Sequence, residues 1–327
     1  MKKYNCITIG GATRDIIFRT DDYCIEIENR KQCYMCFEHG RKIIPRETFF
    51  SFGGGAFNSA VSMVRLGLKV ACIVNVGNHE ASLSLLNHMK EEGIDTRYVL
   101  RSNKKNDYRG ITTFIVDKGK DYAALLYRGT NDKIKISNWG WFNKTEWIYV
   151  SSLTGRSELV LKRLEKRLKK SNVKLAWNPG SVQLKKGYKG LKSLLKLTTV
   201  LLLNDSEARD LVCSKEDKIQ CTIGSMIEEI KSWGPKIVVI TEGAKGAQVA
   251  FDEETVHVGI YKTKVVDTVG AGDAFGSTFV SGLIYGYEPE KALNLASINA
   301  ASVVSRYGAQ DGLLTKIKIL SKLKTKK

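Results

Sequence analysis

The sequence predicts a doubly wound α/β fold, in which helices cover both faces of a mostly parallel sheet. Short apolar segments alternate with amphipathic segments along much of the chain, which is the pattern of βα units. Glycine-rich turns follow several of the apolar segments, as at the carboxyl ends of parallel strands. The 327 residues, 43% of them hydrophobic, fit one large domain over residues 1–327 and exclude a disordered or fibrous chain.

The expected strands of this sheet are short and apolar. They lie at residues 4–9, 69–74, 147–150, 174–177, 199–203 and 236–240. Helices are expected between and after them. They lie in a segment that ends at Gly67 and at residues 82–92, 159–170, 189–196, 205–212, 223–233, 273–285 and 289–307.

Two hairpins interrupt this alternation. Residues 112–116 and 122–127 flank a polar turn, and residues 247–251 and 255–258 form a second pair. The strand-rich stretches near residues 16–50 and 97–128 do not fit the main sheet. We expect them to form a small β-rich layer beside it.

The chain carries a formal charge of +18, because 52 Lys and Arg residues outnumber 34 Asp and Glu residues. Basic residues gather at 162–174 and 316–327, where Leu or Ile recurs at helical spacing. We therefore expect the solvated faces of amphipathic helices. A nucleic-acid partner is the alternative, but no zinc finger, ribonucleoprotein motif or helix-turn-helix accompanies the charge.

Seven dispersed cysteines indicate a reducing compartment rather than a disulfide framework. Cys24, Cys33, Cys36 and His39 lie close together, and Cys33-x-x-Cys36 has zinc-knuckle spacing. No second such pair follows, so we favour small buried thiols over a metal site. No apolar run approaches the ~20 residues of a membrane helix, and no signal-peptide core follows Met1. We expect a cytoplasmic protein without a membrane partner.

The most informative segment is Asp267-Thr268-Val269-Gly270-Ala271-Gly272-Asp273, directly before an expected helix. Its small residues let successive backbone N–H groups point at one spot, where the helix N-terminus adds positive potential. Such a cradle stabilises charge on a transferring phosphoryl group. Asp273 is placed to accept a proton from an attacking hydroxyl. The alternative is a glycine turn followed by an inert N-cap aspartate.

Three other turns are weaker signals. Gly53-Gly54-Gly55 precedes a helix and permits close approach of a ligand, although no Gly-Lys-Ser/Thr of a phosphate-binding loop follows. Asn204 and Glu207 follow an expected strand and are either Mg²⁺ and phosphate ligands or a capping box. Thr241-Glu242-Gly243-Ala244-Lys245-Gly246 is either a nucleotide cradle or a plain turn.

Together and in this order, these four segments resemble the ribokinase-type (PfkB) carbohydrate kinases. The two family signatures match at residues 53–67 and 267–282, and the segments that begin at Asn204 and Thr241 lie between them. The resemblance extends from Ile9 to about Gly312. It implies a ribokinase-like fold whose stretches near 16–50 and 97–128 form a lid that closes over the sugar and often pairs two subunits.

The resemblance implies transfer of the γ-phosphoryl group of ATP to a sugar hydroxyl. Asp273 matches the catalytic base, and the backbone of Gly270, Ala271 and Gly272 matches the anion hole. The other matches are Asn204 and Glu207 for Mg²⁺ and the phosphates, Thr241, Gly243 and Gly246 for the nucleotide, Asp15, Gly53, Gly54 and Asn58 for the sugar, and Asp267 with the loop 306–312 for a monovalent cation such as K⁺.

Several departures leave the substrate open. The stretch 21–45 is longer than a lid strand needs, Phe57 stands where small residues are common, and Gly312 offers no side-chain oxygen to a cation. A nucleoside kinase is the alternative within this fold. The nucleobase of a nucleoside substrate would need an aromatic neighbour, for which the chain offers Phe18, Phe37, Phe114 and Tyr122. An inactive relative and a nucleic-acid-binding relative are remote alternatives, because the segment 270–273 is intact.

Overall fold

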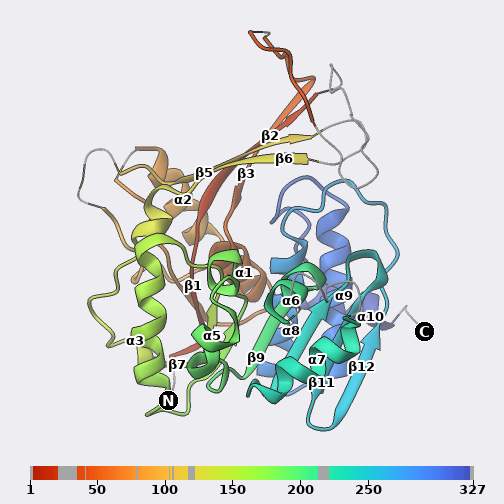
Figure 1. Ribbon diagram of the computed structural model, residues 1–327. Coiled ribbons are helices and arrows are strands. Elements are labelled where there is room, and N and C mark those ends of the chain that lie inside the picture. Colours follow the sequence, from red (N-terminus) through yellow and green to blue (C-terminus); the bar gives the residue numbers. More distant parts are fainter. Residues whose placement is uncertain are drawn as a thin grey trace.

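A large and a small sheet form the framework of the computed structural model, which describes residues 3–20, 35–40, 42–78, 80–102, 104, 107–116, 122–212 and 221–324 (Figure 1). The large sheet has eight strands. In spatial order they are β12 (Glu254–Val258), β11 (Ala247–Phe251), β10 (Ile237–Thr241), β9 (Val200–Asn204), β8 (Lys174–Trp177), β7 (Thr145–Val150), β1 (Tyr4–Ile9) and β4 (Val70–Ile73).

The large sheet is mostly parallel, as predicted. The strands from β10 to β4 run parallel to their neighbours, whereas β11 pairs antiparallel with both β10 and β12. The late hairpin is therefore an antiparallel extension at one edge.

Helices cover both faces of the large sheet (Figure 1). One face packs against α3 (Leu159–Leu168), α4 (Ser181–Leu184), α5 (Gly187–Leu195), α6 (Asp205–Val212) and α7 (Ile223–Ser232). The other packs against α1 (Gly55–Arg65), α2 (Glu80–Glu91), α8 (Ala271–Ile284) and α9 (Pro289–Val304), and α10 (Lys316–Lys324) packs on α9. Short 3-10 turns lie at Gly129–Lys133, Phe142–Lys144, Gly155–Glu158 and Gly243–Lys245.

Alternation along the strands explains this double cover. In β8, Leu175 and Trp177 lie in the core beneath α3 to α7, whereas Ala176 lies in the core beneath α1 and α8. Successive side chains of a strand point to opposite faces. A strand buried on both faces therefore has a continuous apolar run, and this run is what the sequence displays.

The small sheet consists of β2 (Thr13–Arg19), β3 (Glu47–Gly53), β5 (Gly110–Val116) and β6 (Tyr122–Tyr127), in the order β3-β2-β5-β6. It lies above the large sheet in Figure 1. The predicted hairpin is confirmed, because β5 and β6 pair antiparallel. β2 pairs antiparallel with β3 and parallel with β5, an arrangement that the local sequence pattern did not specify.

Two expectations need correction. Helix α8 begins at Ala271 with Gly270 as its N-cap, so Asp273 lies inside the first turn and the N-cap reading of this aspartate is wrong. Cys221 forms a disulfide, which the cysteine count did not predict, whereas Cys6, Cys36 and Cys72 are free. Among the described residues, no helix has the length and apolar character that crossing a bilayer requires.

Candidate active site

The carboxyl ends of neighbouring strands bring the predicted residues to one edge of the large sheet. Asn204 ends β9 and pairs in register with Thr241, which ends β10. On the other side of β8, Ile9 of β1 pairs with Val150 of β7. The turns that follow these strands therefore face one crevice, the usual ligand position in an open parallel sheet.

Asp273 is half-buried and lies in this crevice. Its Oδ2 accepts a hydrogen bond of 2.8 Å from Nδ2 of Asn58, which lies on α1. Burial raises the pKa of Asp273, because the charged form loses hydration, and the amide of Asn58 opposes that rise. Two segments more than 200 residues apart in sequence thus meet at one carboxylate.

The glycine turn before α8 presents its backbone to the same crevice. Gly270 has a left-handed conformation (φ 78°), and an added Cβ would collide with Ala309. The N–H of Ala271 turns back to the carbonyl of Thr268 at 3.3 Å, whereas the N–H groups of Gly272 and Asp273 have no acceptor among the described residues. An anion at this helix start would satisfy them.

Asp15 lies close to Asp273 on the inner face of β2. Its side chain is 3% exposed, and its Oδ1 accepts a 2.7 Å hydrogen bond from the Thr13 hydroxyl. Burial first, and then the charge of Asp273, raise the pKa of Asp15 to about 6, against the hydrogen bonds from Thr13 and Thr112. Gly53 leaves room for this carboxylate, since an added Cβ would meet Asp15 Oδ2.

Gly54 joins the small sheet to α1 through a turn that requires glycine. Its φ is 95°, and an added Cβ would lie 2.5 Å from the carbonyl oxygen of Gly11. The Gly54 carbonyl then accepts the N–H of Asn58 at 2.9 Å, inside the first turn of α1. The three predicted sugar-side positions, Gly53, Gly54 and Asn58, therefore converge with Asp15 beside Asp273.

Asn204 and Glu207 form the capping box that was the alternative interpretation of this pair. The N–H of Asn204 donates to Glu207 Oε2 at 2.9 Å, and the N–H of Glu207 donates to Asn204 Oδ1 at 2.8 Å. Glu207 nevertheless faces Asp273 across a cavity of about 210 Å³ that Thr241 and Gly272 also line. Burial raises the pKa of Glu207, and the charges of Asp210 and Asp273 add to that rise.

The chemistry of this pair fits a magnesium ion held mainly through water and phosphate. One oxygen of Glu207 is occupied by the cap, and its other oxygen is available to the cavity. Mg²⁺ usually takes one or two protein carboxylates and completes its octahedron with substrate phosphates and water. In the part of the chain that the structure describes, no three His, Cys, Asp or Glu side chains are grouped to bind a metal.

A second, mostly apolar cavity of about 340 Å³ adjoins the first. Thr241, Gly272 and Phe275 line both cavities. The further lining residues include Gly243, Gly246, Val258, Ile260, Tyr261 and Ala301. An apolar compartment beside a helix start with free N–H groups has the chemistry to receive the two ends of a nucleotide.

Asp267 is buried beneath the glycine turn and ties two loops together. Its Oδ1 accepts the N–H of Val269 and its Oδ2 accepts the N–H of Gly308, both at 3.0 Å. The loop 306–312 is thereby anchored to the segment that carries Asp273. The K⁺ site stays a prediction.

Two residues of the crevice were missed by sequence reasoning. The hydroxyl of Ser151, directly after β7, is buried without a hydrogen-bond partner among the described residues. The amide of Gln310 donates a 2.9 Å hydrogen bond to Asn58 Oδ1. Gln310 lies in the loop 306–312, which the resemblance had matched only to a monovalent cation. For Ser151, the position at a strand end was the one signal that could have found it.

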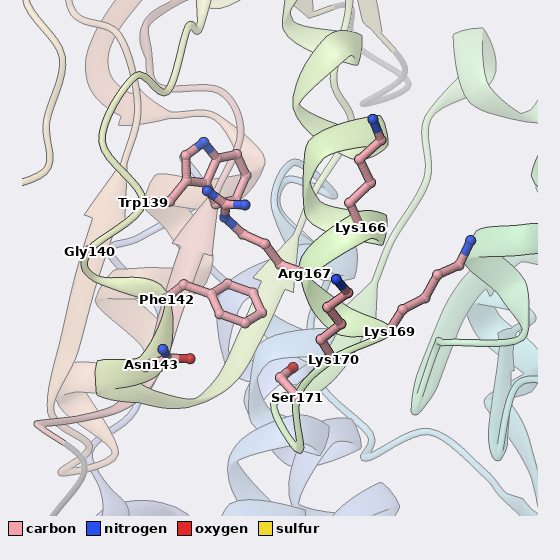
Figure 2. A pocket seen from close by; sticks show the side chains of 9 residues that line it. All are labelled: Trp139, Gly140, Phe142, Asn143, Lys166, Arg167, Lys169, Lys170 and Ser171. Carbon is pink, nitrogen blue, oxygen red and sulfur yellow. The ribbon is translucent and has the colours of Figure 1, made fainter.

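Two other features lie outside the crevice. Cys24 and Cys33 lie outside the described residues, and the remaining members of the cysteine cluster are a half-buried Cys36 and an exposed His39. An open basic cavity of about 720 Å³ lies between α3 and residues 139–143, and Figure 2 shows the side chains that line it. There the Arg167 guanidinium lies 4.6 Å from the centre of the Trp139 ring, and Lys166 and Lys169 extend away.

Comparison with known proteins gives a consistent result. A family model described as pfkB family carbohydrate kinase matches residues 23–316. The chain is 29% identical to an uncharacterized sugar kinase of Archaeoglobus fulgidus, over 77% of this chain and 98% of that protein. It is 27% identical to an ATP-dependent 6-phosphofructokinase of Thermoanaerobacterium thermosaccharolyticum, over 94% and 90% of the two chains.

Solved structures share the fold. A nucleoside kinase of Methanocaldococcus jannaschii, an archaeal member of the ribokinase family, superimposes with a TM-score of 0.78 at 21% identity, over 99% of this chain and 100% of that chain. The predicted ribokinase-like α/β fold is confirmed.

Proposed function

The chain belongs to the pfkB family of carbohydrate kinases, and from that premise we propose that it transfers the γ-phosphoryl group of ATP to a hydroxyl of a small sugar. Asp273 is the proposed base. The observation that carries this proposal is the hydrogen bond from Asn58 to Asp273 beside the helix start, because it joins the base to the residues of both family signatures. A sugar hydroxyl between Asp15 and Asp273 would meet the phosphoryl group at the cradle.

The donor is proposed to occupy the two adjoining cavities. The apolar cavity beside Thr241 and Gly243 suits the adenine ring and ribose of ATP, and the cavity beside Glu207 suits its phosphates. The N–H groups of Gly272 and Asp273 would stabilise the negative charge that spreads over the transferring group. A magnesium ion beside Glu207 and Asn204 would supply further neutralisation of that charge.

The proton of the attacking hydroxyl goes to Asp273 as the new oxygen–phosphorus bond forms and the bond to ADP breaks. Oδ2 already accepts a hydrogen bond from Asn58 Nδ2, so Oδ1 is the proposed acceptor of the proton. The raised pKa of Asp273 makes this carboxylate a better proton acceptor than an exposed aspartate.

The small sheet is proposed to act as the lid of this site. Asp15 and Phe114 share its inner face, where Ile17, Phe114 and Val116 pack together with Val269 of the glycine turn. Closure of such a layer over the sugar would exclude water, which otherwise competes with the sugar as acceptor.

The outer face of the small sheet supports a homodimer. Phe50 and Leu125 lie in one cross-strand row with Ile16, and their side chains are 62% and 66% exposed. Large apolar side chains exposed on one face of a sheet mark an interaction surface, and we propose a second copy of the chain as its partner. Light scattering should give a dimer mass for the parent and a monomer mass for Leu125→Lys, whereas a monomeric parent would contradict the proposal.

The test of function is turnover of ATP with a panel of pentoses, hexoses, keto-deoxy acids and nucleosides. Asp273→Asn should lose at least ~10²-fold in turnover, because a general base contributes that much. The exposed Asp252→Asn is the matched control and should retain parental turnover and stability. Near-parental turnover of Asp273→Asn would refute the assignment of the base.

Nucleosides in the panel decide the alternative substrate class. Phe114 is the aromatic residue best placed to stack on the nucleobase of a nucleoside. It shares the inner face of the small sheet with Asp15 and meets Tyr122 edge-on at 5.3 Å between ring centroids. Phe18 alternates to the other face of β2, and Phe37 is 37% exposed. If turnover is confined to nucleosides, a nucleoside replaces the small sugar as the proposed acceptor.

A further inference from the structure

We infer that Gln310 and His88 are positioning residues, which act through Asn58 to orient the amide that serves the base. This inference rests on the proposed role of Asp273. Four side chains from distant segments form one continuous chain of hydrogen bonds. Asn58 Nδ2 lies 2.8 Å from Asp273 Oδ2, Gln310 Nε2 lies 2.9 Å from Asn58 Oδ1, and His88 Nε2 lies 3.0 Å from Gln310 Oε1.

The direction of every bond in the chain follows from its inner end. An ionised carboxylate only accepts, so Asn58 must turn its NH₂ group toward Asp273. Its carbonyl oxygen then faces Gln310, which must answer with its own NH₂ group. The carbonyl oxygen of Gln310 consequently faces His88, whose Nε2 must carry a hydrogen. One orientation of each amide satisfies all three contacts.

Burial makes this orientation hard to reverse. Asn58 and Gln310 are 4% and 3% exposed, so water cannot replace a lost partner. An inverted Asn58 would aim its carbonyl oxygen at Asp273 and raise the pKa of the base still further. Gln310 therefore keeps the amide that favours the ionised base in place, although it does not touch the reacting atoms.

The loop that carries Gln310 is itself held in place by α1. Arg65 donates to the carbonyl oxygens of Gln310 at 2.7 Å and Leu313 at 3.2 Å, and its guanidinium also pairs with Glu92. The backbone of Gln310 is thus fixed independently of its side chain. A substitution of the side chain should leave the loop in place.

The outer end of the chain touches the small sheet. The His88 ring stacks on Phe52 of β3 at 4.6 Å between centroids and meets Phe57 edge-on at 5.8 Å. His88 Nδ1 lies 3.7 Å from Glu91 Oε2, and His88 Nε2 lies 4.0 Å from Glu92 Oε1, so a carboxylate lies near each ring nitrogen. These contacts fix the ring plane that presents Nε2 to Gln310.

The decisive experiment inverts the polarity of the chain with Gln310→Glu. A carboxylate at 310 offers no donor to Asn58 Oδ1, so the Asn58 amide should turn over and leave its oxygen against Asp273. The acid limb of the kcat/KM profile should then move up by about one pH unit or more. Gln310→Met, which adds no charge, should move the limb in the same direction by less.

Controls separate positioning from general damage. Gln183 is buried with both amide atoms bonded, and it makes no contact with the hydrogen-bond chain of Asp273, Asn58, Gln310 and His88, so Gln183→Glu should lower the thermal midpoint without moving the acid limb. Asp15 and Glu207 also face Asp273, but their surroundings are the same in all these variants. An acid limb that stays at the parental pH in folded Gln310→Glu and Gln310→Met would overturn the inference.

A spectroscopic measurement tests the chain without catalysis. The ¹⁵N shifts of the His88 ring, assigned by comparison with His88→Gln, should report the Nε2–H tautomer above the pH at which the ring is neutral. An Nδ1–H tautomer would overturn the inference whatever the enzyme's activity. Failure of the proposed base would appear instead as retained turnover of Asp273→Asn, so the two failures are distinguishable.

Discussion

Asp15→Asn should stabilise the folded protein at neutral pH while it abolishes phosphorylation of the sugar. Burial raises the pKa of Asp15 to about 6, from 3.8 for an ordinary aspartate. A carboxyl whose pKa is higher in the folded than in the unfolded state binds its proton more tightly when folded. Raising the pH through this window therefore lowers the free energy of unfolding.

The magnitude follows from the two pKa values. A pKa of about 6 against 3.8, at 1.36 kcal/mol for each unit, corresponds to about 3 kcal/mol as the upper bound of the cost at pH 7. Asparagine removes this ionisation and keeps an oxygen that can accept the Thr13 hydroxyl. We expect a gain of roughly 1–3 kcal/mol at pH 7 to 8 and only about 0.5 kcal/mol at pH 4, where Asp15 is protonated in the folded state and only partly ionised in the unfolded state.

Urea unfolding of parent and variant at pH 4, 6 and 8 measures this difference. The carboxylates that titrate in both proteins largely cancel when the two curves are subtracted, and the exposed Asp252→Asn gives the background of an aspartate-to-asparagine change. A stability difference that is the same at pH 4 and pH 8 would refute the reasoning, as would a variant less stable than the parent at pH 8. Loss of turnover in the stabilised variant would show that the site retains a charge at the expense of stability.

Three further outcomes follow from the geometry. Gly270→Ala should lower stability by about 1–3 kcal/mol and reduce turnover, because the residue has φ 78° and its Cβ would collide with Ala309. The control in thermal denaturation is Gly272→Ala, whose added Cβ meets open space. Equal thermal midpoints of the two variants would contradict the prediction. Glu207→Gln keeps an acceptor for the Asn204 N–H, so stability should stay within about 1 kcal/mol of the parent while turnover at limiting Mg²⁺ falls about 10–100-fold. The exposed Glu229→Gln is the control. An unchanged dependence of turnover on Mg²⁺ would count against the proposed magnesium site. Asp267→Asn replaces one of two acceptor oxygens, so urea unfolding should show a loss of about 1.5–3 kcal/mol in the free energy of unfolding. Any activation by KCl over choline chloride at matched ionic strength should also disappear. Unchanged stability would refute the role of Asp267 in joining the two loops.

Local sequence pattern was sufficient where each residue's environment depends on its neighbours in the chain. The apolar run of β8 and the helix α6 were predicted with the bounds that the structure has, Lys174–Trp177 and Asp205–Val212. A strand buried on both faces and a helix with a capping residue both carry their signal within a few residues. The motif Gly270 to Asp273 was equally visible, because only small residues fit the turn.

The small sheet was less accessible to sequence reasoning. In β2 the buried positions include Asp15, so its alternation does not separate apolar from polar residues. The pairing of β2 with β3 and β5 joins segments separated by about 30 and 100 residues. Register between such segments depends on which side chains meet across the sheet, and a local pattern does not contain that information.

The sequence by itself determined the fold class and the residue types of the site, since both depend on periodicity and on turns that only glycine or a small residue can form. Tertiary structure decided which of those residues meet. It joined Asn58 to Asp273, converted the Asn204 and Glu207 capping box into one wall of a cavity, added Gln310 and Ser151 to the crevice, and placed His88 behind Gln310. The physical reason is burial: hydrogen bonds and pKa values in the crevice depend on partners that the folded chain brings from distant segments.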